Sequence, residues 1–108
     1  MTLKTGAGQL LAASVEIAAN PWTRFKGLML RSDLPPALVI ERCSSVHTFF
    51  MRKPIDVAFC AKDGTALRIY RRLRPWRATR FVRGAKLVIE TPAGALDSVQ
   101  PGATLVWS

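Results

Sequence analysis

The clearest structural signal in the chain is the segment Ile55-Asp-Val-Ala-Phe-Cys-Ala-Lys-Asp-Gly-Thr-Ala-Leu-Arg-Ile-Tyr-Arg71. Its two halves are rich in apolar residues and are separated by Asp63-Gly64. An Asp-Gly pair between two apolar runs is a strong signal for a tight β-hairpin turn, because both residues tolerate positive φ. The segment therefore predicts two antiparallel strands, over residues 55–61 and 65–71.

The register of this hairpin depends on the length of its loop. If the Asp-Gly pair alone forms the loop, Ala58 lies opposite Ile69 and Asp56 lies opposite Arg71. That pairing would place a carboxylate beside a guanidinium on a face of small and aliphatic side chains. A three-residue loop with a bulge would instead shift the pairing by one residue.

Shorter apolar segments on both sides of the hairpin extend the β-rich pattern. Asn20 can cap a helix and Pro21 suits its first position, which predicts a short helix over residues 22–29. Many short strands with turn signals between them indicate a mainly β fold, which we expect to be a compact β-sandwich or a partly closed barrel with one or two short helices. The further strands are expected over residues 10–18, 37–40, 85–91 and 103–107.

Composition limits the class of protein. A length of 108 residues suits one domain over residues 1–108. Hydrophobic residues make up 49% of the chain, which excludes a disordered protein. The formal net charge is +9. Such an excess favours contact with nucleic acid, an anionic membrane or an acidic partner, although charge also serves solubility alone.

The sequence contains only weak signals for membrane insertion, secretion or disulfide formation. No stretch reaches the roughly 20 apolar residues of a membrane-spanning helix. The apolar run over residues 10–19 is interrupted by Glu16 and is a poor signal-peptide core, so we expect a cytoplasmic protein. Cys43 and Cys60 do not form a disulfide framework, and both free thiols and a single bridge remain open.

A set of short motifs occurs in a fixed order along the chain. The motifs are Arg24-Phe-Lys-Gly-Leu-Met-Leu-Arg31, Leu34-Pro35, Phe50-Met51-Arg52, Pro54-Ile-Asp-Val-Ala-Phe59, Asp63-Gly64, Pro75, Leu87-Val-Ile-Glu90 and Ala93-Gly94. Taken together they resemble the DUF192 family, also called UPF0127, over nearly the whole sequence. The resemblance implies a compact, mainly β domain of sandwich type and no particular reaction.

Residues 45–59 place polar side chains within a largely apolar segment, and buried polar groups must be satisfied or used. Cys43, His47 and Met51 are soft metal ligands at spacings of four residues. A blue-copper site needs a second histidine, however, and the chain has only one. The trio could still hold Cu(I), but on a strand His47 would lie about 13 Å from each of the other two, so we expect no metal and no cofactor.

Catalysis has three candidate residues, His47, Asp56 and Cys43. A carboxylate can orient a histidine for acid–base work, and a cysteine thiolate needs an electropositive setting. The alternative for His47 is a hydrogen-bonded, half-buried side chain without a catalytic role.

Arginines offer two further possibilities. Arg24, Arg31 and Arg52 could form an anion site, because a guanidinium presents a planar fork to carboxylate or phosphate. The alternative is internal pairing with carboxylates, and we expect Asp56 to pair with an arginine such as Arg71.

Residues 71–83, the arginine-rich segment, hold six arginines with Pro75, Trp76 and Phe81 between them. We expect a long loop. It could follow a phosphate backbone while its aromatic rings stack on bases, although no known nucleic-acid motif surrounds it. A solvated charged surface is the alternative.

The combined hypothesis is a small soluble binding or accessory module for a small anion or an extended polar molecule held in a cleft. One alternative is a small enzyme that uses His47 with Asp56 or Cys43. Another is binding of nucleic acid or an acidic partner through the arginine-rich segment. The residues expected to line the cleft are Arg24, Arg31, His47, Thr48, Met51, Arg52, Asp56 and Trp76, with Phe49 and Phe50 as apolar walls.

Overall fold

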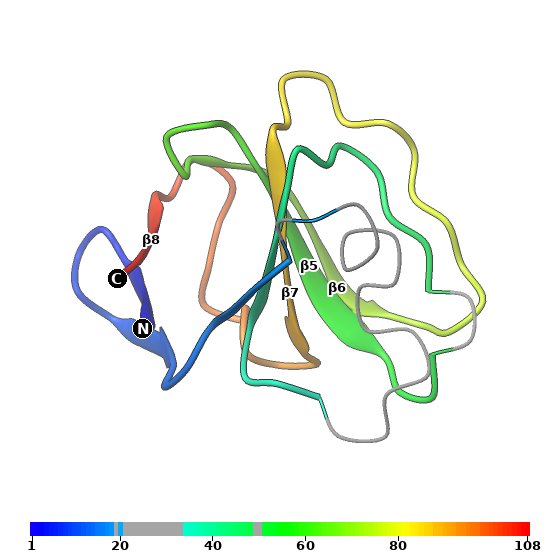
Figure 1. The fold of residues 1–108 in the computed structure, drawn as a ribbon, viewed down its shortest axis with the longest axis horizontal. Coiled ribbons are helices and arrows are strands. Elements are labelled where there is room, and N and C mark those ends of the chain that lie inside the picture. The colour runs from blue at the N-terminus through cyan, green and yellow to red at the C-terminus, as the bar shows by residue number, and fades with distance from the viewer. Residues whose placement is uncertain (19, 21–33, 49–50) are drawn as a thin grey trace.

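Two β-sheets form the framework of the molecule (Figure 1). The computed structural model of the chain describes residues 1–18, 20, 34–48 and 51–108. A three-stranded sheet has the order β2-β1-β8, and a five-stranded sheet has the order β3-β4-β7-β5-β6. The strands are β1 (Leu3–Thr5), β2 (Leu10–Ala12), β3 (Glu16–Ala18), β4 (Leu38–Glu41), β5 (Ile55–Cys60), β6 (Ala66–Leu73), β7 (Leu87–Pro92) and β8 (Leu105–Trp107).

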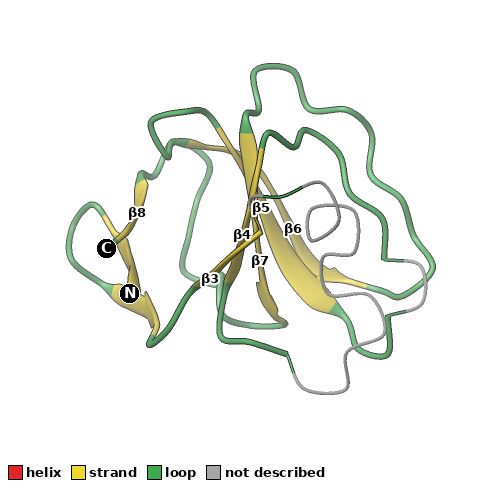
Figure 2. Cartoon of the chain, viewed as in Figure 1, coloured by secondary structure: helices red, strands yellow, loops and turns green. Residues whose placement is uncertain are grey.

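The mainly β fold predicted from the sequence is confirmed. Figure 2 shows strands and loops, and no helix, in the part of the chain that the structure describes. The helix expected over residues 22–29 lies outside the described residues. The single strand expected over residues 10–18 is two strands, β2 and β3, which belong to different sheets. Residues 13–15 therefore carry the chain from the small sheet to the large one.

The central hairpin, β5 with β6, confirms part of the predicted register. The Ala61 amide donates to the Thr65 carbonyl at 2.9 Å, so the loop has three residues, and Gly64 takes a φ of 91°. This is the bulged alternative, which shifts the pairing by one residue. A second irregularity beside Phe59 restores the predicted pairing of Ala58 with Ile69.

The core lies on both faces of the large sheet. One apolar cluster fills the space between the sheets, with Leu3 and Leu105 from the small sheet and Ala58 and Ile89 from the large one. The other cluster lies on the opposite face, where side chains such as Phe59 pack against loop residues. Burial on both faces explains why β5 is buried at all six positions.

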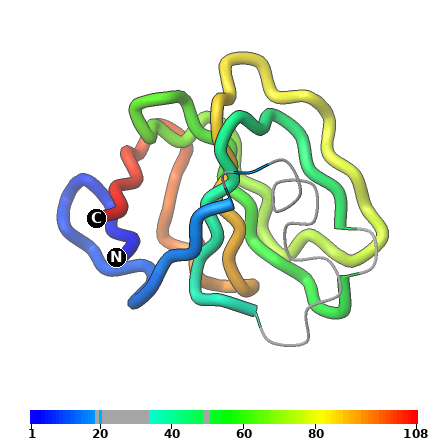
Figure 3. Tube along the Cα trace, in the orientation of Figure 1, coloured from blue at the N-terminus to red at the C-terminus, as the bar shows by residue number. Residues whose placement is uncertain are grey.

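Two long loops run side by side over the second face. The Thr48 amide donates to the Arg77 carbonyl at 2.7 Å and the Thr79 amide donates to the Val46 carbonyl at 2.8 Å. The Val82 amide donates to the Ser44 carbonyl at 2.8 Å. In the tube of Figure 3 the same two loops run together, and the two chain ends lie near each other on the other side of the molecule. The arginine-rich segment is thus a loop beyond Leu73, as expected, but its backbone is held by hydrogen bonds.

Candidate functional site

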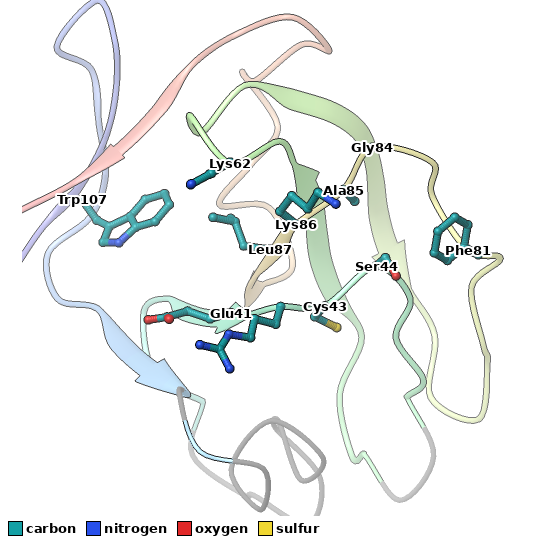
Figure 4. A pocket seen from close by; sticks show the side chains of 11 residues that line it. Glu41, Cys43, Ser44, Lys62, Phe81, Gly84, Ala85, Lys86, Leu87 and Trp107 are labelled. Atoms are coloured by element: carbon teal, nitrogen blue, oxygen red, sulfur yellow. The ribbon is translucent and has the colours of Figure 1, made fainter.

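A cleft of about 660 Å³ opens where one end of the large sheet meets β8. Figure 4 shows Trp107 at one side, Phe81 at the other and Leu87 between them. The end of β4 with the loop that follows it, the loop before β7 and the hairpin loop bring in the remaining residues. The lining is formed by Glu41, Arg42, Cys43, Ser44, Lys62, Phe81, Gly84, Ala85, Lys86, Leu87 and Trp107.

The cleft is cationic. Arg42, Lys62 and Lys86 are exposed at its wall, against one carboxylate, Glu41. Among the residues that the structure describes, no carboxylate lies within 4.0 Å of these three cations, since the ion pair found there joins Arg72 to Asp97. Arg42 has a φ of 55°, a left-handed conformation that is uncommon for a residue with a side chain. Unpaired cations around an apolar floor suit an anionic ligand.

The two cysteines differ, and both are free thiols. Cys43 is partly buried, lines the cleft and donates through Sγ to the Ser45 carbonyl at 3.0 Å. Cys60 is fully buried, and burial raises the pKa of its thiol to about 12, with a smaller contribution from the charge of Asp63. Cys60 is therefore an unreactive core residue, whereas Cys43 is the thiol at the cleft.

Asp56 does not pair with Arg71, so that prediction is wrong. The Asp56 side chain is fully buried, and its oxygens accept hydrogen bonds from the main-chain amides of Arg72, Gly94 and Leu96 at 2.9, 2.9 and 3.0 Å. An irregularity in the pairing between Ile55 and Val57 displaces the partner strand here. The Arg71 guanidinium instead donates to the Val99 carbonyl. Three amide donors satisfy the carboxylate, which leaves it sealed from any ligand.

The other predicted site residues have varied surroundings. Thr48 is fully buried, and its hydroxyl donates to the Arg74 carbonyl at 2.6 Å and accepts from the Arg77 amide at 2.8 Å. Met51 is buried in the core cluster around Phe59. These two side chains therefore act in packing and loop anchoring.

The remaining members of the predicted set stay predictions. His47 is half-buried and forms an isolated bridge with Ala78, while Arg52 and Trp76 are exposed. In the described part of the chain no three His, Cys, Asp or Glu side chains gather as a metal cluster. Four predicted residues lie outside the described residues: Arg24, Arg31, Phe49 and Phe50.

Glu90 is a feature that the sequence analysis did not single out. It lies on β7 between Leu38 and Val57, is only 3% exposed, and its Oε1 has no hydrogen-bond partner in the part of the chain that the structure describes. Burial raises the pKa of this carboxyl to about 8. The signal in the sequence was a single charge at the end of the apolar run that begins at Leu87.

Comparisons with known proteins place the whole chain in one family. The DUF192 family, described as an uncharacterised ACR, matches residues 2–107. The chain belongs to the DUF192 family. A UPF0127 protein from Thermococcus sibiricus is 37% identical over 99% of this chain and 74% of its own length. One from Pyrococcus abyssi is 39% identical over 86% of this chain and 85% of its own length.

Solved structures share the fold of this DUF192 chain. A protein of unknown function from Novosphingobium aromaticivorans superposes with a TM-score of 0.83 at 20% identity, covering 98% of this chain and 82% of its own. A protein described as a putative transcription regulator from Sinorhizobium meliloti gives a TM-score of 0.80 at 27% identity, covering 97% and 89%. The described residues hold no helix long and apolar enough to cross a membrane.

Proposed function

We propose that this DUF192 chain is a binding module for a small organic anion that carries an apolar group, with the cleft beside Trp107 as its site. The observation that carries the proposal is the meeting of three exposed cations, which form no ion pair with any described residue, with an apolar floor and an aromatic wall. Small-molecule sites commonly combine an apolar lining with a few charged groups that orient the ligand. A volume of about 660 Å³ falls within the usual range for such sites.

The charges and the apolar groups have separate roles in this proposal. The guanidinium of Arg42 and the ammonium groups of Lys62 and Lys86 donate charge-assisted hydrogen bonds to a carboxylate or phosphate. Leu87 and the Trp107 ring remove the apolar part of the ligand from water. The Glu41 carboxylate disfavours a ligand with a second anionic group at its end of the cleft.

This site differs from the cleft expected from the sequence. The anionic ligand is retained from that hypothesis, while the lining moves to β8, the hairpin loop, the end of β4 with the loop after it, and the start of β7 with the loop before it. The ligand site expected from the sequence around His47 and Arg52 remains a separate prediction. The acid–base alternative through Asp56 loses its physical basis, because three main-chain amides occupy that carboxylate.

Phenyl phosphate is a suitable probe, since it combines an anion with an aromatic ring. Titration followed by ¹H–¹⁵N NMR should shift the Trp107 indole signal and the amides of residues 62 and 84–87, with saturation. The double variant Lys62→Gln/Lys86→Gln should bind at least about tenfold more weakly, because two charge-assisted contacts are lost.

The matched control is Lys4→Gln, which removes an exposed lysine on β1, outside the cleft lining. It should leave the affinity for phenyl phosphate within about twofold. Shifts scattered over the surface, or equal affinities for the double variant and the unmodified chain, would refute the cleft as the anion site.

A further inference from the structure

The positive charge of the molecule is concentrated in one part of the chain. Residues 64–89 contain seven arginines and one lysine and no aspartate or glutamate, so they carry a formal charge of +8 out of the net +9. Six of these eight cations lie in the arginine-rich segment, which begins within the last residues of strand β6. Such a concentration of one sign produces a local positive potential, which attracts polyanions.

Two of the arginines in this segment are committed to internal contacts. The Arg71 guanidinium donates to the Val99 carbonyl. Arg72 makes two parallel hydrogen bonds of 2.9 Å to the Asp97 carboxylate, a paired geometry that holds both side chains. These contacts connect the start of the segment to Asp97 and Val99, so Arg71 and Arg72 already have partners within the chain.

The other four arginines, Arg74, Arg77, Arg80 and Arg83, are exposed. Within the described residues no carboxylate pairs with them, and the one polar contact recorded for their guanidinium groups is a long bond of 3.5 Å from Arg77 to the Trp76 carbonyl. They follow one another along a single loop, at intervals of three residues. The loop therefore presents a row of guanidinium groups to solvent.

Two large aromatic side chains lie within the same row. Trp76 is 56% exposed and Phe81 is 70% exposed, in contrast to Phe59, which is completely buried in the core. Both rings are thus largely open to solvent, and exposed aromatic side chains often mark a binding surface.

Buried contacts hold the backbone beneath these rings. The Trp76 amide donates to the Thr48 carbonyl at 3.0 Å, while the buried Thr48 hydroxyl bonds to main-chain groups of Arg74 and Arg77. Trp76 itself has a φ of 63°, which is strained for a residue with a side chain. A loop held in this way loses less entropy when it binds a partner.

We propose that the exposed part of the arginine-rich segment, residues 74–83, binds single-stranded nucleic acid. The four arginines contact successive phosphates, and Trp76 and Phe81 stack on unpaired bases. This activity goes beyond anion binding in the cleft: the two surfaces share Phe81, whereas Trp76 and the four arginines lie outside the cleft lining. Because every base has a π-face, the expected binding depends little on sequence.

Single strands fit this surface better than the alternative polyanions. A duplex hides its base faces and is entered by a helix or a two-stranded ribbon, whereas this segment is a loop. Binding to an anionic membrane is stabilised by a broad apolar face, whereas residues 74–83 expose only two separated aromatic rings. Arginine, which supplies all the cations of residues 74–83, combines bidentate phosphate contacts with stacking on bases.

Fluorescence anisotropy with labelled dT₁₂ tests the proposal. The unmodified chain should bind at 20–50 mM salt, with log K falling by about 3 per decade of salt if four phosphates are contacted. Arg80→Gln should reduce that slope by about 0.7, whereas Lys4→Gln, which removes one charge elsewhere, should leave it unchanged.

The aromatic variants distinguish stacking from simple charge attraction. Trp76→Ala and Phe81→Ala should each weaken binding of dT₁₂ by about tenfold, and Trp76→Phe should retain most of the affinity. Phe81→Leu should behave like Phe81→Ala, because leucine keeps the apolar volume and loses the stacking face. NMR spectra of each variant confirm that the fold is intact before binding is measured.

Three results would overturn the proposal: no binding of dT₁₂ at 20 mM salt, equal affinity for a twelve-base-pair duplex, or alanine variants that bind like the unmodified chain. Binding to vesicles of phosphatidylserine that Phe81→Leu preserves, without binding to dT₁₂, would instead identify a membrane surface.

Discussion

Asp56 shows how a charged side chain can be necessary for a fold without serving a ligand. It occupies a strand that is buried along its whole length, where an unsatisfied carboxylate would be very costly. The main-chain amides of Arg72, Gly94 and Leu96 donate hydrogen bonds to its two oxygens. The side chain thus joins segments that are about 16 and 40 residues away in sequence.

Asp56→Asn should lower the free energy of unfolding by about 2–3 kcal/mol, because one amide-accepting oxygen becomes an NH₂ group that faces a donor. Urea denaturation followed by far-UV circular dichroism measures the change. The matched control is Asp63→Asn in the exposed hairpin loop, where the amide oxygen can still accept from the Thr65 amide. Equal stabilities of the two variants would contradict the anchoring role of Asp56.

Glu90 is the opposite case, a buried carboxyl whose Oε1 accepts no hydrogen bond from the described residues. Its pKa is about 8 in the folded chain against an ordinary value of 4.5. Below pH 4.5 both states are protonated and Glu90 has no effect on stability. Between pH 4.5 and 8 the unfolded state is ionised and the folded state is not, so stability falls as pH rises, and above pH 8 the loss is complete.

Glu90→Gln should therefore gain stability relative to the unmodified chain by about 1.4 kcal/mol per pH unit between pH 5 and 8. Chemical denaturation at four pH values in that interval gives the free energy of unfolding of both proteins. Subtracting the value of the unmodified chain from that of the variant cancels the contributions of other titratable groups. Glu41→Gln, an exposed position at the cleft, should show no such trend. A difference that is constant with pH would mean that Glu90 is ionised in the folded protein.

Among the elements, the central hairpin was the most predictable from sequence. The apolar runs and the Asp-Gly pair located β5 and β6, and the pairing of Ala58 with Ile69 is confirmed. The sequence left two loop lengths open, with and without a bulge, because the choice between them depends on contacts with other elements. Gly64, for example, packs against the backbone of Leu105, and the Leu105 amide donates to the Gly64 carbonyl at 2.9 Å.

Strand β1 and the cleft could not be predicted from the sequence, because both depend on residues that are distant along the chain. A strand of three residues such as Leu3–Thr5 has too little periodicity to be recognised, and it forms only through its two neighbours. The cleft draws on Lys62, Leu87 and Trp107, which lie far apart in sequence. No local sequence pattern links such residues. The arginine-rich segment, in contrast, is continuous in sequence and could be recognised from its composition.

Gly64→Ala tests how the hairpin loop meets β8. A Cβ atom at this position would collide with the Leu105 carbonyl oxygen, and the φ of 91° adds strain. We expect a loss of about 3 kcal/mol in thermal or chemical unfolding. Gly8→Ala is matched in backbone conformation, with a φ of 96° and no atom within 4 Å of the new Cβ, and should cost only about 1 kcal/mol. Similar losses at both positions would show that the collision is relieved.

At the scale of the whole molecule, the two sheets share one core. Leu3 and Leu105 of the small sheet pack in the same cluster as Ala58 and Ile89 of the large sheet. The backbone adds to this link, since the Ala66 amide donates to the Ala103 carbonyl at 2.8 Å. The arrangement predicts that the sheets unfold together, which also keeps Trp107 of the small sheet fixed against the cleft.

Leu3→Ala should therefore destabilise both sheets equally, by about 3 kcal/mol, because Leu3 is completely buried in the shared core. Amide hydrogen exchange measures this strand by strand, and the protection of β5 amides should fall by the same free energy as that of β1 amides. Leu10→Ala, on the same sheet but at a side chain that is 56% exposed, should change protection by less than about 1 kcal/mol. Loss of protection confined to β1, β2 and β8 would show instead that the small sheet opens independently, and the cleft would then lose its Trp107 wall without unfolding of the large sheet.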